Sequence, residues 1–502
     1  MKTYIFILII FLPGFFSCTS LEEEPMGVYA PESFFTSAAD VEAAVFGAYG
    51  LMASEPFWGR KLSLPIMLLS DMVDIGNPGT PTRRVQINDF TSDAYNGMVS
   101  EFWPRSYMII SAANTAISGA ESLDNISDEE RNALIAEAKF ARALVYFDLV
   151  RLFGDIPYIG KAINDPESLI DISKTSAQEV YNSIMDDLEF GVDYLPDQQI
   201  SRARASRASA AAMLADVHLT LGNWNEAYNN AKWVIDNATK LDVSLEPDYQ
   251  VLFDASQHDG QKEHIFVIDF LGLQSGTEYW EGDDLTGPLT GVGGGSDMAG
   301  WDVAVPSLNV YNSFDDRDYR KQVAFVTETT FSGELKPYTE WQFPRPYIAK
   351  YTRYPGKANN DARWSDCNYA IYRYADVLLM AAEAGNEVSG PNAELEGYVN
   401  QVRERARNAA GVMNDFPENV SVGMSKDEFR DMVLEERRIE LCFEFKRWWD
   451  ISRRKLGDQV FKGANSLEPH ENFDAGKDYL LALPQDELDR NPNLKPQNPG
   501  YN

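Results

Sequence analysis

The stretch SRASAAAMLADVHLTLGNWNEAYNNAKWVID, residues 206–236, decides the fold class. Its small and apolar residues recur every three or four positions, which is the period of one face of an α-helix. A Gly222-Asn223 turn divides the stretch, so the pattern predicts two antiparallel helices. The small side chains permit close packing of the two helices, and the residues predicted to face inward are Ala208, Ala211, Ala212, Ala215, Leu219, Ala227, Ala231 and Val234.

The spacing Leu-Ala…Gly-x-Trp-x-x-Ala in this hairpin resembles a tetratricopeptide repeat, in which helix pairs stack side by side. A generic helical hairpin is the alternative for this segment alone. Further helices are predicted over residues 128–154, from about Tyr372, over Leu395–Ala409 and over Lys426–Arg454. The sequence therefore predicts a mainly α protein with a scaffold of tetratricopeptide-like helix pairs.

Residues 240–365 interrupt the helical pattern. Glycine, proline and aromatic residues become frequent there, with a triple glycine at 293–295 and tryptophans at 280, 301, 341 and 364. Alternation of apolar and polar residues predicts short strands at Ile265–Phe270 and Gln322–Val326. Long loops in a folded protein are usually functional or disordered, and the aromatic content argues against disorder. We expect a loop-rich, functional region mounted on the helical scaffold.

Length and composition restrict the class of protein. The 502 residues exceed the roughly 250–300 at which one hydrophobic core stops growing, so two or three sub-structures or a repeat array are expected. Hydrophobic residues make up 44% and charged residues 24%, which fits a folded soluble protein and excludes a multi-span membrane protein. The net charge of −33 repels a phosphate backbone, which argues against nucleic acid as a partner.

The N-terminus has the features of an export signal. Residues 1–17, MKTYIFILIIFLPGFFS, contain one lysine and an apolar run that is too short to span a bilayer and fits a signal peptide. A small residue, Ser17, precedes Cys18 as in a bacterial lipoprotein cleavage site, and an acidic run follows at Glu22–Glu24. This junction predicts that Cys18 carries lipid. The acyl chains would give the protein a stable membrane anchor. An ordinary signal peptide that ends near a cysteine is the alternative.

Motifs for metal, disulfide or catalytic chemistry are weak. Three cysteines cannot form a disulfide framework or a four-ligand zinc site, and Cys367 and Cys442 are expected to be unpaired and buried. The sequence has no Gly-x-Ser-x-Gly, His-Glu-x-x-His, P-loop or Gly-x-Gly-x-x-Gly motif. We therefore expect no enzyme activity and no cofactor. We also expect no metal site, because the four histidines lack the spacing of metal ligands; they are His218, His258, His264 and His470.

An ordered set of motifs along the chain resembles the SusD/RagB family of Bacteroidetes outer-membrane lipoproteins. The first half carries Trp103-x-x-x-Tyr107, Glu137-Ala138-Lys139-Phe140-x-Arg142-Ala143 and Leu152-Phe153-Gly154-Asp155-Ile156-Pro157. The second half carries Tyr372-Arg373-Tyr374-Ala375-Asp376-Val377, Asn400-x-Val402-Arg403-x-Arg405-Ala406, Glu436-Arg437-Arg438-x-Glu440, Phe443-Glu444-x-x-Arg447-Trp448-x-Asp450-Ile451 and the close Gln497-Asn498-Pro499-Gly500-Tyr501. One such motif is weak, but the ordered set is specific.

This resemblance implies a cell-surface lipoprotein that captures a glycan and delivers it to a SusC-like TonB-dependent β-barrel transporter. It also divides the chain into a signal peptide (1–17), a lipid-anchored acidic tether (18–36), an N-terminal helical region (37–239), the loop-rich region (240–365) and a C-terminal helical region (366–502). Three alternatives remain open: a surface-anchored glycoside hydrolase, a peptide-binding member of the family and a purely structural adaptor. The implied location is the outer membrane, to which the protein is anchored by lipid and from which it faces the extracellular side.

Charged residues in the C-terminal motifs could form a site or a scaffold. Arg437, Glu440, Glu444 and Arg447 are spaced by three, four and three, which would align them on one helix face. We predict that this stripe forms ion pairs with neighbouring helices and does not hold a substrate. The Trp448-Trp449 pair is predicted to pack in the core, and the expected ion-pair partners are Arg373, Glu383, Arg403 and Arg405.

Candidate ligand contacts come from the loops, because a glycan binder needs exposed aromatic platforms flanked by hydrogen-bonding side chains. Tyr279 and Trp280 lie in a polar stretch, and Trp301 lies where the resemblance places the second-half binding loop. The resemblance also implies a second wall in the loop from Asp74 to Asn96, with Asn77, Arg83 and Arg84 as hydrogen-bonding residues. That loop lacks the tryptophan common in the family, and Trp58 and Trp341 are predicted to pack.

Overall fold

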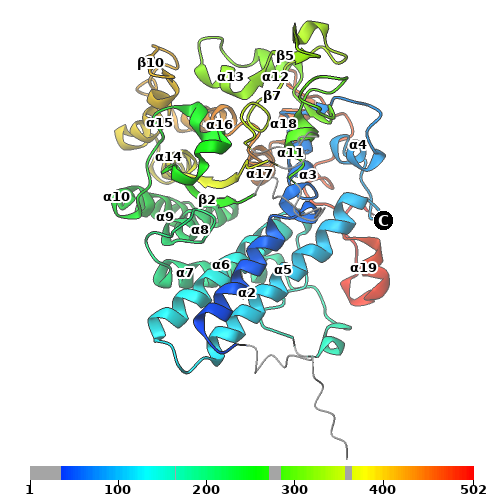
Figure 1. Ribbon diagram of the computed structural model, residues 1–502, viewed down its shortest axis with the longest axis vertical. Coiled ribbons are helices and arrows are strands. Elements are labelled where there is room, and N and C mark those ends of the chain that lie inside the picture. The colour runs from blue at the N-terminus through cyan, green and yellow to red at the C-terminus, as the bar shows by residue number, and fades with distance from the viewer. Residues whose placement is uncertain (1–34, 164, 271–283, 357–364, 502) are drawn as a thin grey trace, which may run out of the picture.

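The computed structural model describes residues 35–163, 165–270, 284–356 and 365–501. Helices build most of this part of the chain, and short two-stranded sheets lie between them (Figure 1). The predicted mainly α fold class is confirmed. The long helices are α2 (Ala38–Met52), α5 (Gly97–Ser122), α6 (Asp128–Phe153), α7 (Ala177–Tyr194), α8 (Arg207–Leu221), α9 (Trp224–Asp236), α14 (Tyr374–Ser389), α15 (Ala393–Ala406) and α16 (Lys426–Glu440).

Helices α8 and α9 form the hairpin predicted from residues 206–236. Ser206 caps the start of α8, and Gly222 ends it with φ of +74°, a left-handed conformation that glycine adopts without strain. All eight residues predicted to face inward are buried. Helix α8 is also buried on its other sides, because α7 and α14 pack against it. The sequence pattern predicted one buried stripe and missed this second layer.

Helix α6 begins and ends where the sequence indicates. The Ser127 Oγ accepts a hydrogen bond from the Glu130 N–H (3.2 Å), and Gly154 follows the last turn with φ of +70°. From Leu134 onward most of its side chains are buried, because α2, α5 and α7 surround it. These helices lie side by side in the lower half of Figure 1. Neighbouring pairs stack as the tetratricopeptide-like pattern predicts.

The predicted helix over Lys426–Arg454 is wrong as one continuous element. Helix α16 ends at Glu440, and α17 spans Arg447–Arg454. Between them Phe443 and Phe445 have φ of +63° and +61°, and both rings are buried. The break places these two rings in the core and directs Glu444 toward Arg373, so packing overrides helix propensity.

The loop-rich region contains most of the strands. The strand predicted at Ile265–Phe270 is present as β2 (His264–Ile268). The predicted strand Gln322–Val326 is mostly helical, because α13 (Tyr319–Ala324) precedes two residues of strand. Asp318 caps α13 by accepting a hydrogen bond from the Arg320 N–H (3.0 Å), which starts the helix. The strand pairs are all antiparallel: β1 (Asp74–Ile75) with β3 (Ala304–Val305), β2 (His264–Ile268) with β8 (Tyr369–Arg373), β4 (Phe325–Val326) with β7 (Tyr347–Ile348), β5 (Glu328–Phe331) with β6 (Glu334–Pro337), and β9 (Asn408–Ala409) with β10 (Val412–Met413).

The predicted helix over Leu395–Ala409 also ends early. Helix α15 stops at Ala406, and Asn408–Ala409 forms strand β9. The hairpin turns at Gly411, whose φ of +92° suits glycine. The Asn408 side chain accepts a hydrogen bond from the Gly411 N–H (2.8 Å), which closes the turn. The turn closed by Asn408 and Gly411 therefore ends the helix before the predicted boundary at Ala409.

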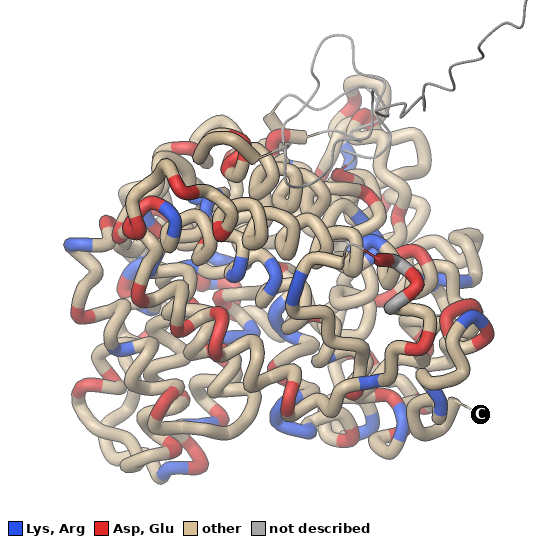
Figure 2. Tube along the Cα trace, turned by 90° about the horizontal axis from the view of Figure 1, so that it is seen from below, with Lys and Arg blue, Asp and Glu red and all other residues tan. Residues whose placement is uncertain are grey.

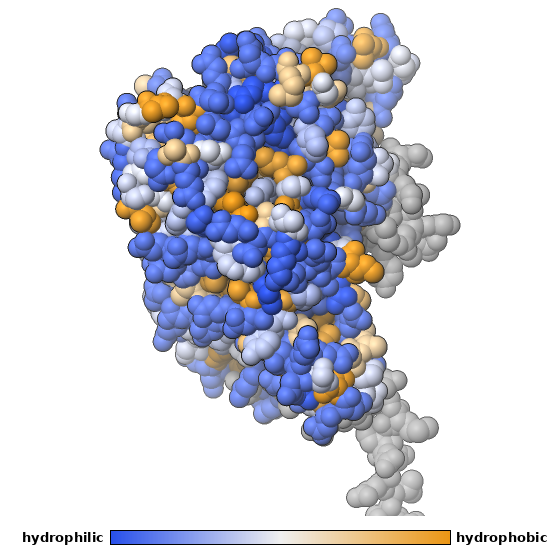
Figure 3. Space-filling view, turned by 90° about the vertical axis from the view of Figure 1, so that its left-hand side faces the viewer, coloured by the Kyte–Doolittle hydropathy of each residue, from blue (hydrophilic) through white to orange (hydrophobic). Residues whose placement is uncertain are grey.

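One hydrophobic cluster runs from Ala48 to Leu494 and joins the regions 37–239 and 366–502 in a shared core. Figure 3 shows a face that is mostly hydrophilic with small hydrophobic patches, as a solvated surface is. Within the described ranges, no helix is long and apolar enough to cross a membrane. The residues whose predicted burial is confirmed are Trp58, Trp341, Trp448, Trp449 and the two free cysteines Cys367 and Cys442.

Candidate ligand-binding site

The two walls expected for the site meet at the β1–β3 ribbon. Asp74 lies opposite Val305 in the pairing of the two strands. Beyond them the Asn77 N–H donates to the Asp302 carbonyl oxygen (2.6 Å). The structure therefore brings the Asp74–Asn96 loop beside Trp301, although more than two hundred residues separate them in sequence. The β1–β3 ribbon therefore joins the two loops that carry the described candidate ligand contacts.

The glycine-rich turn before Trp301 fixes the position of that tryptophan. The Trp301 N–H donates to the Pro288 carbonyl oxygen (2.7 Å), and at Gly300 a Cβ would collide with the backbone of Gly291. Asp302 follows with φ of +55° and accepts hydrogen bonds from the Gly293 N–H (2.6 Å) and the Tyr347 hydroxyl (2.7 Å). The turn is tight and holds Trp301 half-buried against the core, so only part of its ring faces solvent.

The predicted polar contacts differ in how available they are. Asn77 is half-buried, and its Oδ1 accepts a hydrogen bond from the Gly79 N–H (2.9 Å), which holds the turn. Arg83 and Arg84 lie on α4 (Thr82–Asn88), where Arg83 is half-buried and Arg84 is 6% exposed. Tyr279, Trp280 and Cys18 lie outside the described residues, so their predicted roles stay predictions.

A hollow of about 430 Å³ opens at the other end of the β1–β3 ribbon. The Arg345 guanidinium ties it to β1, because Nη2 donates to the Ile75 carbonyl oxygen (2.9 Å) and Nη1 lies 3.5 Å from the Asp74 carboxylate. Phe343 supplies an aromatic ring at its edge. An aromatic surface beside amide, carboxylate and guanidinium groups is chemistry that suits a sugar ring. The lining residues are Ser307, Leu308, Asn309, Phe343, Pro344 and Arg345.

Helix α12 (Leu308–Asn312) forms one wall of the hollow. Ser307 caps it by accepting a hydrogen bond from the Val310 N–H (3.3 Å), and the Ser307 N–H donates to Glu468 Oε1 (2.9 Å). Burial raises the pKa of Glu468 to about 7, so this carboxyl group titrates near neutral pH. Leu308 stays 43% exposed at the rim. The wall is thus positioned by a helix cap and a buried carboxyl group from a distant loop.

Sequence reasoning missed this hollow. Its aromatic residue, Phe343, lies between Gln342 and Pro344 in a stretch without helical or strand periodicity. Trp341 in the same stretch was correctly predicted to pack, and its Nε1–H donates to the Lys336 carbonyl oxygen (3.1 Å). The resemblance that selected Trp301 names no residue of this stretch, and proline-rich flanks indicate packing.

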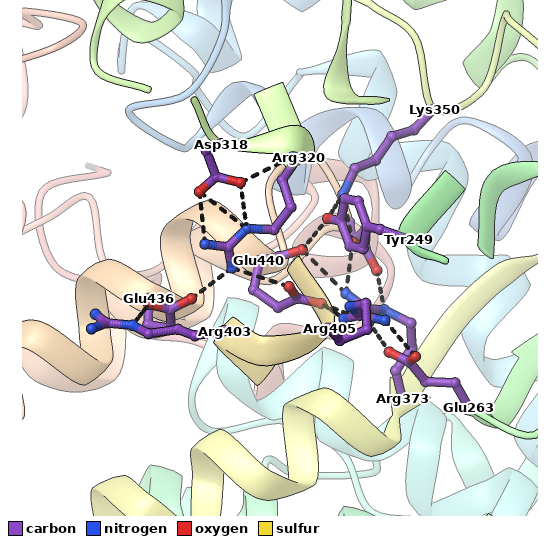
Figure 4. Close-up of polar contacts among 11 residues, drawn as sticks. Tyr249, Glu263, Asp318, Arg320, Lys350, Arg373, Arg403, Arg405, Glu436 and Glu440 are labelled. Atoms are coloured by element: carbon purple, nitrogen blue, oxygen red, sulfur yellow. Dashed lines mark hydrogen bonds and ion pairs between the residues drawn. The ribbon is translucent and has the colours of Figure 1, made fainter. Parts of the chain in front are cut away.

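The charged residues of the C-terminal motifs form buried ion pairs, as predicted (Figure 4). Glu440 at the end of α16 lies among Arg320, Arg373 and Arg405. Although burial opposes ionisation, these three cations lower the pKa of Glu440 to about 2. Glu444 binds Arg373 (2.7 Å), which confirms the predicted role of Arg373 and Arg405 as partners. These buried pairs link helices and a strand, so they are scaffold.

Details of the predicted stripe need correction. Because the helix breaks after Glu440, Glu444 and Arg447 do not continue the face of α16. Arg447 binds the Asp71 carboxylate through two bonds of 2.7 Å. Predicted partners Arg403 and Glu383 pair elsewhere, Arg403 with Glu436 and Glu383 with the arginines of α17. In the part of the chain that the structure describes, no group of three His, Cys, Asp or Glu side chains could hold a metal ion.

The architecture is that of a helical protein of tetratricopeptide-like pairs that carries a loop-built face. Comparison with known proteins is consistent with it. Residues 262–501 match the model of the SusD family, and residues 64–219 match a family described as starch-binding, associating with the outer membrane. SusD-like protein P2 of Formosa agariphila is 50% identical over 100% of both chains. The chain belongs to the SusD family.

Solved structures agree with this assignment. A SusD homolog from Bacteroides thetaiotaomicron superposes with a TM-score of 0.80 at 22% identity, covering 94% of this chain and 98% of its own. A laminarin-binding SusD-like protein superposes with a TM-score of 0.76 at 21% identity, covering 93% and 100%. At such identities the likeness establishes the fold and not the ligand.

Proposed function

We propose that this protein binds a glycan at the β1–β3 ribbon and its adjoining hollow, on the outside of the cell. The observation that carries the proposal is the hollow itself, where Phe343 lies beside Arg345 and Asn309 on a face that the two halves of the chain build together. Family membership and the laminarin-binding relative support a glycan as ligand. Peptide binding, glycan hydrolysis and a ligand-free adaptor are the alternatives that the tests below separate.

We further propose that the protein is lipid-anchored at Cys18 in the outer membrane and delivers its glycan to a SusC-like TonB-dependent transporter. The signal sequence and the Ser17-Cys18 junction support the anchor. The match to a family described as associating with the outer membrane supports the location. No bond of the glycan needs to break in this scheme, because the protein binds and the barrel imports.

Substitution of the two candidate aromatic residues tests the site. Phe343→Ala and Trp301→Ala should each weaken binding of the cognate polysaccharide by about 1–2 kcal/mol, or roughly 5- to 30-fold, because each removes a stacking surface. A screen of host and plant polysaccharides identifies the ligand, and titration calorimetry measures the affinity. Tyr194→Ala on α7 is the matched control, since Tyr194 is 43% exposed on the helical scaffold.

The outcomes distinguish the alternatives. Unchanged affinity in the Phe343→Ala/Trp301→Ala double variant, with an unchanged melting temperature, would place the site elsewhere. Release of reducing ends from a bound polysaccharide would instead support a hydrolase. Binding of peptides with no saccharide bound would support the peptide-binding alternative, and binding of neither would leave an adaptor.

Co-purification tests delivery to a transporter. Gentle detergent extraction from cells grown on the inducing nutrient, followed by affinity purification of this protein, should recover a large outer-membrane barrel in near-stoichiometric amount. An unrelated tagged lipoprotein from the same cells is the control for nonspecific capture. Recovery of the protein alone would contradict the delivery model while leaving glycan binding intact.

A further inference from the structure

Four cationic side chains gather beside the candidate site: Arg60, Lys61, Arg83 and Arg84, here called the basic cluster. Among the described residues, two carboxylates form ion pairs with them, Glu55 and Glu101. Two positive charges are therefore uncompensated in a chain whose net charge is −33. Elsewhere acidic and basic residues are interleaved along the trace (Figure 2). A local cationic excess in such an acidic protein calls for an explanation.

Contacts with surrounding elements place the cluster. The Lys61 ammonium lies 2.5 Å from the Glu101 carboxylate on α5, and a Cβ on Gly97, one turn earlier, would lie 3.4 Å from Arg83 Cδ. Arg60 is paired with Glu55. Arg84 Nη1 donates to Thr80 Oγ1 (3.0 Å) in the loop that follows Asn77. The cluster thus lies where α4, which carries Arg83 and Arg84, meets the first turns of α5.

Backbone hydrogen bonds connect the cluster to Trp301. The Leu285 N–H donates to the Gly59 carbonyl oxygen (3.0 Å), immediately before Arg60. Leu285 precedes α11 (Thr286–Thr290), and the Pro288 carbonyl oxygen in that helix accepts the Trp301 N–H (2.7 Å). The backbone just before Arg60 and the Trp301 N–H are therefore bonded to the start and the middle of the same short segment. The basic cluster is thus connected through α11 to the turn that carries Trp301.

The Nε–H groups of the three arginines in the cluster lack acceptors. Among the described residues, the buried Nε atoms of Arg60, Arg83 and Arg84 have no hydrogen-bond partner, and no carboxylate lies within 4.0 Å of Arg83 or Arg84. Buried donors in proteins are normally bonded. Burial, and then repulsion by Arg60 and Arg83, lowers the pKa of Arg84 to about 10, which still leaves it charged at neutral pH. By contrast, the buried Arg373 has three carboxylate partners.

We infer that the basic cluster binds an anionic substituent of the glycan, a carboxylate or a sulfate, so that the substrate class is an acidic polysaccharide. This inference rests on the proposed glycan-binding function. Guanidinium groups bind planar or tetrahedral oxyanions through paired N–H donors, and such charge-assisted bonds are stronger than neutral ones. The ligand would supply oxygen acceptors to the terminal N–H groups of Arg83 and Arg84, whose only side-chain acceptor among the described residues is Thr80 Oγ1, while Trp301 contacts a neighbouring ring.

Binding of three polysaccharides to the intact protein tests the inference: polygalacturonate, which carries carboxylates, a sulfated galactan, and a neutral β-glucan. Wild-type protein should bind one of the anionic polymers more tightly than the neutral one, with an affinity that falls as salt increases. Arg84→Met should lower that affinity about 10-fold, because it removes a charge-assisted bond. Which anionic polymer responds identifies a carboxylate or a sulfate as the group bound.

Stability separates a binding role from a structural one. Arg84→Met removes a buried charge that has no carboxylate partner, so its melting temperature should equal or exceed that of the wild type. Arg207→Met on α8 makes the same change in net charge and should alter neither affinity nor its salt dependence. A variant Arg84→Met that binds the anionic polymer as tightly as wild type, or that binds less and melts lower, would overturn the inference.

Failure of this inference differs from failure of the proposed function. Equal binding of the neutral glucan and both anionic polymers, unaffected by Arg84→Met, would refute the anionic substrate class and leave glycan binding standing. Binding of no glycan in these assays or in the wider polysaccharide screen would refute both.

Discussion

A Cys18→Ala chain is expected to leave the outer-membrane fraction almost completely. Each buried methylene of an acyl chain contributes about 0.8 kcal/mol to membrane binding, so loss of all acyl chains removes the anchor. Among the described residues no helix could replace it by spanning the bilayer. Cell fractionation followed by immunoblotting measures the redistribution, and mass spectrometry of the N-terminal peptide of the wild type shows the lipid.

The control for this experiment is Cys367→Ala, which removes a buried thiol and keeps the junction at Ser17-Cys18. That variant should stay with the membrane. Retention of the Cys18→Ala chain in the outer membrane, with an unmodified N-terminal peptide in the wild type, would show that residues 1–17 are an ordinary signal peptide and that another interaction holds the protein in place.

Replacement of Arg373 by methionine should lower the free energy of unfolding by about 3–5 kcal/mol, because it leaves buried carboxylates without their counter-ion. Arg373 contacts Glu263, Glu440 and Glu444, and its side chain is 1% exposed. Although burial alone would lower the pKa of Arg373, these carboxylates raise it well above its ordinary value. Urea unfolding followed by tryptophan fluorescence gives the free energy.

Arg317→Met is the matched control, because Arg317 is paired with Asp315 at the surface with 59% of its side chain exposed. It should leave the urea midpoint unchanged. A double variant, Arg373→Met with Glu440→Leu, should recover part of the loss, since it removes a carboxylate together with its cation. An Arg373→Met protein as stable as the wild type would mean that Arg405, Arg320 and Lys350 neutralise the carboxylates without it.

The helices with strong periodicity could be predicted from sequence because small and apolar residues recur along them at the helical period. Helix α6 matches the predicted 128–154 stretch almost to the residue, and the α8–α9 hairpin matches 206–236. The break at Phe443 could not be predicted, because long-range packing of the Phe443 and Phe445 rings decides it. The helix at Tyr319–Ala324 has one local signal, the Asp318 cap, but the ion pair of Arg320 with Glu436 is long-range. Local periodicity carries no information about such partners.

The candidate site was only partly predictable for a related reason. Two loops, one after Asp74 and one around Trp301, could be named from the family resemblance, and the structure pairs them in one ribbon. The hollow beside Phe343 depends on where α12 and the Phe343–Arg345 loop come together, which no local pattern specifies. The orphaned donors of Arg83 and Arg84 likewise become visible only when every neighbouring carboxylate has been placed.

The buried ion pairs around Glu440 also bear on how such a chain could be secreted. Glu263 meets Arg373 and Arg405, which follow it by more than one hundred residues, and both of those meet Glu440. Until residue 440 has been synthesised, folding would enclose charges whose partners are missing, and that cost opposes early collapse. An extended nascent polypeptide is the form that a translocation channel threads. The late closure of these pairs would therefore delay folding and keep the chain competent for export.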